Sequence, residues 1–112
     1  MAEGGTREHQ VHDLTPEEVA LGLSEGRVVL VDVREANELD VERYPGAVHV
    51  PLSAFDPADI PDSAGKHVVF ACSSRKRSVT ASLAAQHQGY DYDSHLAGGM
   101  IGWKAAGFPT ET

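Results

Sequence analysis

The sequence predicts an α/β fold, with a small parallel sheet of about five strands and helices on both of its faces. Two runs, residues 28–33 (VVLVDV) and 68–71 (VVFA), are nearly continuous in apolar and β-branched residues, as strands buried on both faces are. Segments with helical spacing alternate with these strands, which favours parallel pairing. Since 112 residues are too few for two cores, we expect one domain over residues 9–112 behind a mobile tail at residues 1–8.

The first half of the chain alternates strands with helices. Thr15 can cap a helix, Pro16 suits its first position and Glu18 completes a capping box. Gly26 is a favourable residue just past its end. The expected elements here are a strand at 10–12, this first helix, a strand at 28–33, a short acid-rich helix at 35–43 and a brief strand at 48–51.

The second half begins with a connecting segment at 53–65 and continues with the strand at 68–71. From Ser78 the spacing of Val79, Leu83, Ala84 and His87 predicts a helix with those residues on its buried face. Gly89 is a good stop for this helix. A last strand is expected at 93–96, and a final helix around 101–106 that carries Trp103 as a core aromatic residue.

Cys72, the only cysteine, lies where the strand at 68–71 turns into the following helix. The first N–H groups of a helix lack partners and its dipole places partial positive charge there, so this turn favours a thiolate. The candidate nucleophile is therefore Cys72, although a lone cysteine after an apolar strand can equally be an inert core residue. Three cations follow within five residues, and the candidate anion-binding loop consists of Ser73, Ser74, Arg75, Lys76, Arg77 and Ser78.

Other polar residues are weaker candidates. Asp32 and Arg34 end a predicted strand, where ligands gather in open parallel sheets, so they either support the site or form a local ion pair that shapes the turn. His49 could act as a base for the thiol, but no spacing supports it. His9 and His12 stand three residues apart without a third ligand at a useful spacing, so we expect no metal site and no cofactor.

The turn CSSRKRS at residues 72–78 resembles the active-site loop of the rhodanese family of sulfurtransferases, in which a cysteine opens a six-residue loop before a helix. The chain departs from the family at Glu42-Arg43-Tyr44, where Gly-His-Ile is usual, and at Arg75, where glycine is common. A non-glycine residue at positive φ costs about 1–2 kcal/mol, so the loop either avoids that conformation or is strained. Three further stretches agree in order and spacing: LVDVREANEL (30–39), YPGAVHVPL (44–52) and LAGGMIGWKAAGFP (96–109).

The resemblance implies a rhodanese-like fold and sulfur transfer, in which the Cys72 thiolate takes the sulfane sulfur of a donor such as thiosulfate and passes it to a thiol or cyanide. It also implies that the Asp32–Arg34 segment packs beneath or beside the cysteine loop. Two alternatives stay open. One is a cysteine-dependent phosphatase or arsenate reductase of the same fold, although such loops enclose five residues between Cys and Arg and this loop encloses four. The other is a non-catalytic interaction module.

Composition narrows the partners. The formal net charge is −8, which argues against nucleic acid or an anionic membrane as a partner, and makes a local basic loop necessary for a small anionic sulfur donor. The sequence shows neither a membrane span nor a secretory leader, and a reactive lone thiol suits a reducing compartment, so we expect a cytoplasmic protein. A thiol or a protein is the expected sulfur acceptor. The sequence does not indicate an oligomeric state.

Overall fold

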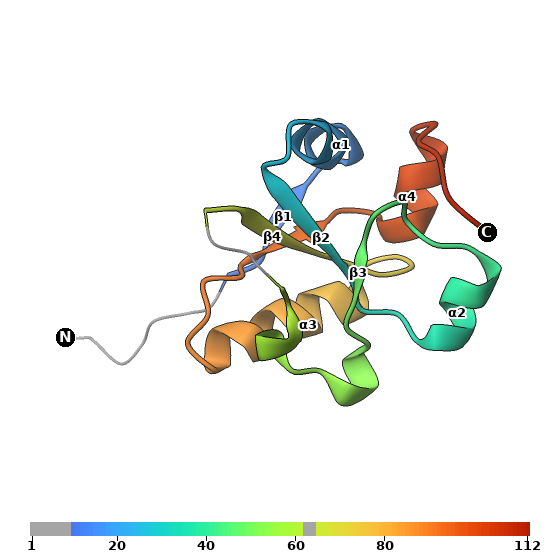
Figure 1. Cartoon of the computed structure of the whole chain (residues 1–112). Coiled ribbons are helices and arrows are strands. Elements are labelled where there is room, and N and C mark those ends of the chain that lie inside the picture. The colour runs from blue at the N-terminus through green and yellow to red at the C-terminus, as the bar shows by residue number, and fades with distance from the viewer. Residues whose placement is uncertain (1–9, 62–64) are drawn as a thin grey trace.

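The structure, a computed structural model, describes residues 10–61 and 65–112; the tail predicted at residues 1–8 lies outside these ranges. Its centre is a five-stranded, all-parallel sheet with the strand order β1-β5-β4-β2-β3 (Figure 1). The predicted α/β class and the parallel sheet are confirmed. The strands are β1 (His12–Leu14), β2 (Val28–Asp32), β3 (Val48–His49), β4 (His67–Ala71) and β5 (Ser94–Leu96).

Helices cover both faces of this sheet, with α1 and α4 on one face and α3 on the other (Figure 1). Within the described residues, no helix is long and apolar enough to cross a bilayer. The helices are α1 (Pro16–Ser24), α2 (Ala36–Val41), α3 (Lys76–His87) and α4 (Gly99–Ala105), and two 3₁₀ turns, η2 (Leu52–Ala54) and η3 (Pro57–Asp59), lie in the connection after β3.

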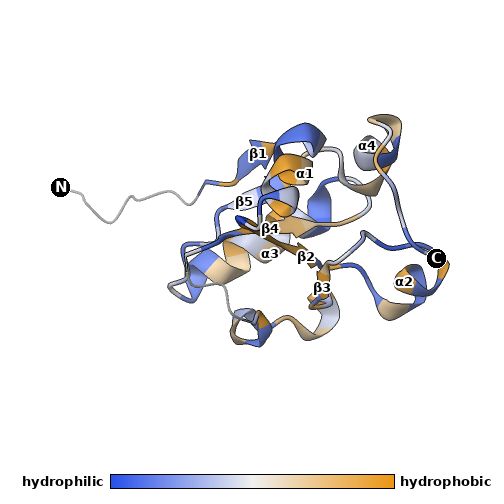
Figure 2. Cartoon of the chain, turned by 45° about the horizontal axis from the view of Figure 1, so that its top comes forward, coloured by the Kyte–Doolittle hydropathy of each residue, from blue (hydrophilic) through white to orange (hydrophobic). Residues whose placement is uncertain are grey.

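The core forms two layers because side chains alternate along the central strands. On β4, Val68 and Phe70 pack toward α3, whereas Val69 and Ala71 pack toward α1 and α4. The central strands β2 and β4 are accordingly the most continuously hydrophobic ribbons of the chain (Figure 2). Cys72 continues the alternation and lies in the layer under α3.

The start of α1 follows the predicted capping box. The Thr15 hydroxyl accepts from the Glu18 N–H at 3.1 Å, and the Thr15 N–H donates to the Glu18 carboxylate at 2.9 Å. Gly26 follows the helix with a φ of 72°. The first strand is His12–Leu14 rather than 10–12, because its register is set by pairing with β5.

The predicted buried face of α3 is wrong. The helix buries Ser78, Ala81, Ser82 and Ala85, while Leu83 is 38% exposed and His87 is exposed. Small residues face the sheet because they let the helix axis approach it closely. Ser82, one of the two buried serines on this face, is satisfied, since its hydroxyl donates to the Tyr92 carbonyl at 2.7 Å.

Candidate active site

Cys72 lies at the predicted turn, between the end of β4 and the first turn of α3. The residue is only 1% exposed. Its Sγ accepts a hydrogen bond from the Ser78 N–H at 3.4 Å, and its S–H donates to the Ser78 hydroxyl at the same distance. A sulfur held by the first turn of a helix and by a hydroxyl is placed where negative charge on it is stabilised.

The loop of residues 73–78, here called the cysteine loop, follows Cys72 directly. Its N–H groups and the carbonyls at its start have different surroundings. Among the described residues, the N–H groups of residues 73–77 meet no hydrogen-bond acceptor. The carbonyls are held from the other side, because the Met100 N–H donates to Cys72 O at 2.9 Å and the Ile101 N–H to Ser73 O at 3.1 Å. The first turn of α4 thus fixes the loop by its carbonyls and leaves its amides available to an anion.

Gly99 makes this docking of α4 on the cysteine loop possible. It adopts a φ of 56°, and a Cβ at this position would lie 2.5 Å from the Ser73 carbonyl carbon and 2.6 Å from Cys72 O. The backbone at Gly99 thus approaches the backbone of Cys72 and Ser73 too closely for any residue with a side chain.

Tyr44 anchors the same carbonyl from the opposite layer. Its ring is 1% exposed, and its hydroxyl donates to Cys72 O at 2.6 Å. Burial raises the pKa of this phenol, which therefore stays a hydrogen-bond donor at all physiological pH values. The tyrosine that replaces the family's usual residue thus holds the backbone of the candidate nucleophile.

Two of the three loop cations are already paired. Arg77 donates to both Glu38 oxygens, at 2.6 and 2.9 Å, and to the Ser73 hydroxyl at 3.0 Å. These hydrogen bonds from Arg77 lower the pKa of the Glu38 carboxyl to about 2. Arg75 pairs with Asp13 at 3.2 Å. Lys76 makes no ion pair with any described residue.

The loop avoids the conformation that would strain Arg75. Its backbone has φ −148° and ψ −42°, so the arginine is not in the left-handed region that favours glycine. Arg75, at the position where glycine is common in the family, therefore causes no left-handed backbone strain in this loop.

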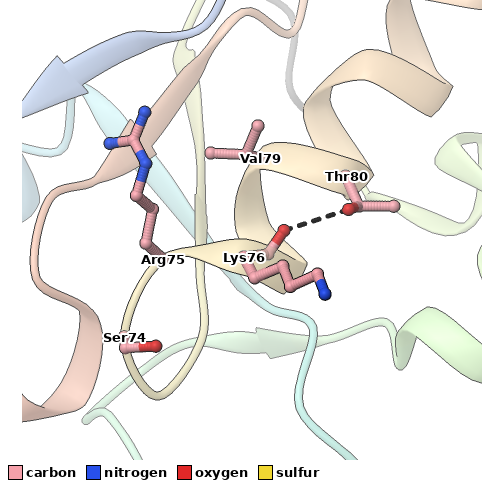
Figure 3. A pocket seen from close by; sticks show the side chains of 5 residues that line it. All are labelled: Ser74, Arg75, Lys76, Val79 and Thr80. Carbon is pink, nitrogen blue, oxygen red and sulfur yellow. Dashed lines mark hydrogen bonds between the residues drawn. The ribbon is translucent and has the colours of Figure 1, made fainter.

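A pocket lies beside the cysteine loop and is lined by Ser74, Arg75, Lys76, Val79 and Thr80 (Figure 3). The Arg75 side chain extends along one side of it toward β1, and Lys76 extends the other way. Cys72 does not line this pocket. The pocket can hold a molecule next to the loop, but it does not by itself lead to the sulfur.

Asp32 and Arg34 form a buried ion pair, with side chains 1% and 5% exposed and an N–O distance of 2.8 Å. Arg34 also donates to the Glu42 carbonyl at 2.9 Å, and its guanidinium lies 5.6 Å from the centre of the Tyr44 ring. The pair is thus a turn-organising ion pair that also packs behind the tyrosine holding Cys72. His49 contacts the Arg34 carbonyl at 2.7 Å instead of the thiol.

A buried histidine that the sequence analysis did not single out completes the surroundings of the sulfur. His95 is 0% exposed, with Nδ1 2.8 Å from the Ser78 hydroxyl and Nε2 2.6 Å from an Asp13 oxygen. No sequence spacing links positions 13, 78 and 95, because the adjacency of β1 and β5 and the packing of α3 on β5 bring them together. Glu38 and Tyr44 were missed because their contacts with Arg77 and with Cys72 O also join segments that are far apart in the sequence.

The histidines show no metal centre in the described part of the chain. His12 lies 3.5 Å from Asp93, and His9 lies outside the described residues. No group of three His, Cys, Asp or Glu side chains gathers within ion-binding range among residues 10–61 and 65–112.

The fold and the site together define the class, an α/β domain with its single cysteine on a strand-to-helix loop. The rhodanese-like domain model matches residues 15–106. The chain belongs to the rhodanese-like family, and the predicted resemblance is confirmed.

Two proteins with similar sequences extend this finding. The chain is 32% identical over 102 residues to thiosulfate sulfurtransferase GlpE of Actinobacillus succinogenes, covering 89% of this chain and 90% of that one. It is 41% identical over 83 residues to an uncharacterized protein of Synechocystis, covering 74% of this chain but spanning only 46% of that protein. The predicted likeness to thiosulfate sulfurtransferases is confirmed.

A solved structure agrees in fold. The crystal structure of a thiosulfate sulfurtransferase from Pseudomonas aeruginosa superposes with a TM-score of 0.80 at 27% identity. The match covers 90% of this chain and 20% of that longer one.

Proposed function

We propose that this protein is a sulfurtransferase that carries sulfane sulfur as a persulfide on Cys72. The observation that carries the proposal is the setting of the sulfur. It accepts from the Ser78 N–H at 3.4 Å, inside a loop whose other amides have no acceptor in the described structure. The family and its thiosulfate sulfurtransferase members support the same chemistry.

The reaction divides into two displacements, as covalent catalysis by a soft nucleophile does. The Cys72 thiolate donates its electron pair to the outer sulfur of thiosulfate, a new S–S bond forms, and the bond to the sulfonate sulfur breaks. Sulfite leaves with the electron pair of the broken bond. A thiolate or cyanide then attacks the outer sulfur of the persulfide, and the Cys72 thiolate is released. Ping-pong kinetics are expected.

The cysteine loop is proposed to hold the anionic outer sulfur. The available N–H groups of residues 73–77 are the donors. The Ser74 hydroxyl can add a further donor, and those of Ser73 and Ser78 can do so by turning away from Glu38 and from the Arg75 carbonyl. In comparable anion holes, loss of one donor costs about 2.7–4 kcal/mol of transition-state stabilisation. The paired Arg75 and Arg77 shape the loop, and Lys76 is the charge left to attract the donor.

Burial of Cys72 places a condition on this chemistry. A residue that is 1% exposed cannot meet a donor unless the cysteine loop shifts. The loop is held by the Arg77–Glu38 and Arg75–Asp13 pairs and by a hydrogen bond from the Ser73 hydroxyl to Glu38 at 3.2 Å, and the Arg75–Asp13 pair is largely solvent-exposed. Exposed pairs contribute about 0–1 kcal/mol, so moving the loop at that end costs little. A reducing compartment such as the cytoplasm would keep the thiol ready.

The phosphatase alternative is not favoured. A phosphatase needs its loop arginine to grip the oxyanion, whereas Arg77 is bound by the Glu38 carboxylate and by Ser73. The relatives named as thiosulfate sulfurtransferases point the same way.

The test is to mix the pure protein with thiosulfate and cyanide and to measure thiocyanate. We expect thiocyanate from the wild type and none above background from Cys72→Ser, with thermal unfolding confirming that the variant is folded. Lys104→Gln, a change away from the loop, serves as the control that keeps activity. Hydrolysis of an aryl phosphate without thiocyanate would contradict the proposal.

A further inference from the structure

We propose that His95 is a positioning residue that receives the thiol proton of Cys72 through Ser78 and holds it against Asp13. The inference deepens the proposed function, on which its catalytic meaning rests, by naming how the nucleophile becomes ionised. It is carried by an unbroken series of contacts from the sulfur to the surface. These are 3.4 Å from Sγ to the Ser78 hydroxyl, 2.8 Å from there to Nδ1 of His95, and 2.6 Å from Nε2 to Asp13.

The direction of the proton follows from which atoms can donate. A carboxylate only accepts, so Nε2 of His95 carries a hydrogen that it donates to Asp13, and in the neutral ring Nδ1 is a bare acceptor. The single hydrogen of the Ser78 hydroxyl can point to Nδ1 at 2.8 Å or to the Arg75 carbonyl at 2.9 Å; in the proposed relay it points to Nδ1, and the hydroxyl oxygen accepts from the Cys72 S–H. Each group in the series therefore offers its proton to the next, from sulfur to imidazole.

The transfer leaves every partner satisfied. The thiol proton moves to the Ser78 oxygen as the Ser78 proton moves to Nδ1, and the electron pair stays on sulfur as a thiolate. His95 then donates from both nitrogens, to Ser78 and to Asp13. The Ser78 hydroxyl turns either to the thiolate or to the Arg75 carbonyl, which lies 2.9 Å from it.

The surroundings of His95 suit an imidazole that is alternately neutral and protonated. It is 0% exposed and lies on β5 between β1 and β4, under α3. The charged and titratable groups that face His95 are Asp13 from β1 and Cys72 after β4. Arg75, at the start of α3, is bound to Asp13. The residue paired with His95 on β4, Phe70, is apolar.

Asp13 is suited to stabilise an imidazolium. The hydrogen bond with His95 lowers the pKa of the Asp13 carboxyl, so this group is ionised at neutral pH. A buried imidazolium needs such a partner, because an unpaired charge in this layer would be costly. The side chain of Asp13 is 55% exposed, so the proton has a route to solvent.

The experiment uses the single cysteine, which makes alkylation site-specific. The rate of modification of Cys72 by iodoacetamide is followed by intact mass at pH 6 and pH 9 in the full chain. For each variant, the rate at pH 9 is divided by the rate at pH 6, so that differences between variants in access to the buried sulfur cancel. The variants are His95→Asn, which can still bond Ser78 but cannot take its proton, and Asp13→Asn at the exposed end.

We expect the wild-type rates at the two pH values to agree within about threefold. In His95→Asn the rate at pH 6 should fall about 10²-fold below that at pH 9, as for an ordinary thiol with a pKa near 8.5. Asp13→Asn should show about a tenfold difference. His67→Asn is the matched control, because His67 also bonds a serine, Ser94, at 2.7 Å, and it should follow the wild type.

Two outcomes would overturn the inference. One is a wild type whose alkylation rates at pH 9 and pH 6 differ about 10²-fold, as for an ordinary thiol. The other is a set of variants whose ratios of these two rates equal that of the wild type, even if each variant reacts more slowly at both pH values. Should His95→Asn fail to fold, Asp13→Asn decides alone. The thiocyanate assay on the same samples keeps the two proposals apart. Absent thiocyanate with a flat wild-type ratio would reject sulfur transfer and leave the relay standing.

Discussion

At the scale of single residues, the backbone of Cys72 is held more tightly than its side chain. Tyr44 and Met100 both donate to its carbonyl, while the hydrogen bonds of the sulfur to described residues are the two with Ser78. A rigid backbone with a lightly held sulfur suits a nucleophile that must reach a substrate and return. The inert-cysteine interpretation explains the burial of the thiol but not the loop of amides without acceptors around it.

Gly99→Ala tests this backbone anchor. We expect a loss of more than about 2 kcal/mol of unfolding free energy and a large loss of thiosulfate activity, because the new Cβ would meet Ser73 and Cys72 O at 2.5–2.6 Å. The measurements are urea unfolding and thiocyanate formation.

Gly26→Ala is the matched control, since Gly26 also has a positive φ of 72° but nothing within 4 Å of its would-be Cβ. It should cost about 1–2 kcal/mol through backbone strain and leave activity intact. Equal effects of the two substitutions would show that the contact with the cysteine loop is not what requires Gly99.

At the scale of elements, the cysteine loop is tied to three helices. It begins α3, its carbonyls bind the first turn of α4, and Arg77 reaches Glu38 on α2. The segment that follows β2 thus supports the loop after β4, although the two are far apart in the sequence. The resemblance anticipated this packing from the Asp32–Arg34 segment but did not identify Glu38 as the residue that makes the contact.

Glu38→Gln tests the tie between α2 and α3 through its pH dependence. Pairing with Arg77 lowers the pKa of Glu38 from the ordinary 4.5 to about 2, so the carboxylate stabilises the fold above pH 4.5 and loses this effect as pH falls toward 2. After allowance for solvent screening, we expect the variant to be less stable by about 1 kcal/mol at pH 7. Urea unfolding as a function of pH is the measurement.

The difference between wild type and Glu38→Gln should shrink between pH 4.5 and 2 and vanish below. Glu17→Gln, which removes an exposed carboxylate of α1, should show no such pH-dependent difference. A constant gap for Glu38→Gln across this range would mean that the ion pair does not contribute.

Local sequence patterns predicted the strands and helices but not the contacts between them. Continuous apolar runs marked β2 and β4, and Thr15 with Glu18 marked the start of α1, because those signals are local. The buried face of α3 was misjudged because close packing selected Ala81 and Ala85 over the larger Leu83. The approach of Asp13 to His95 depends on strand order, which no local pattern encodes.

At the scale of the whole molecule, an acidic body carries one small basic region. The formal net charge is −8, and Arg75 and Arg77 are each compensated by a carboxylate. Lys76, which lines the pocket at the cysteine loop (Figure 3), is therefore the loop cation without an ion pair among the described residues. A dianionic donor is repelled by the net negative charge of the protein and attracted locally by Lys76.

Lys76→Gln is expected to lower kcat/KM for thiosulfate about threefold at low ionic strength, the range of a single exposed charge interaction. The wild-type advantage should approach zero near 1 M salt, where the screening length is about 3 Å. Lys104→Gln changes the net charge equally but removes a cation paired with Glu42 at 2.9 Å, and should have little effect. A salt-independent loss, or the same loss in both variants, would contradict this role.

Sulfur transfer by this protein requires that sulfur become covalently attached to Cys72, and intact mass measures that attachment directly. After exposure to thiosulfate and removal of excess reagent, the wild type should gain about 32 Da, and a reductant should remove the added mass. Cys72→Ser should gain nothing under the same conditions. An unchanged wild-type mass, or an equal gain in the serine variant, would contradict the proposed persulfide.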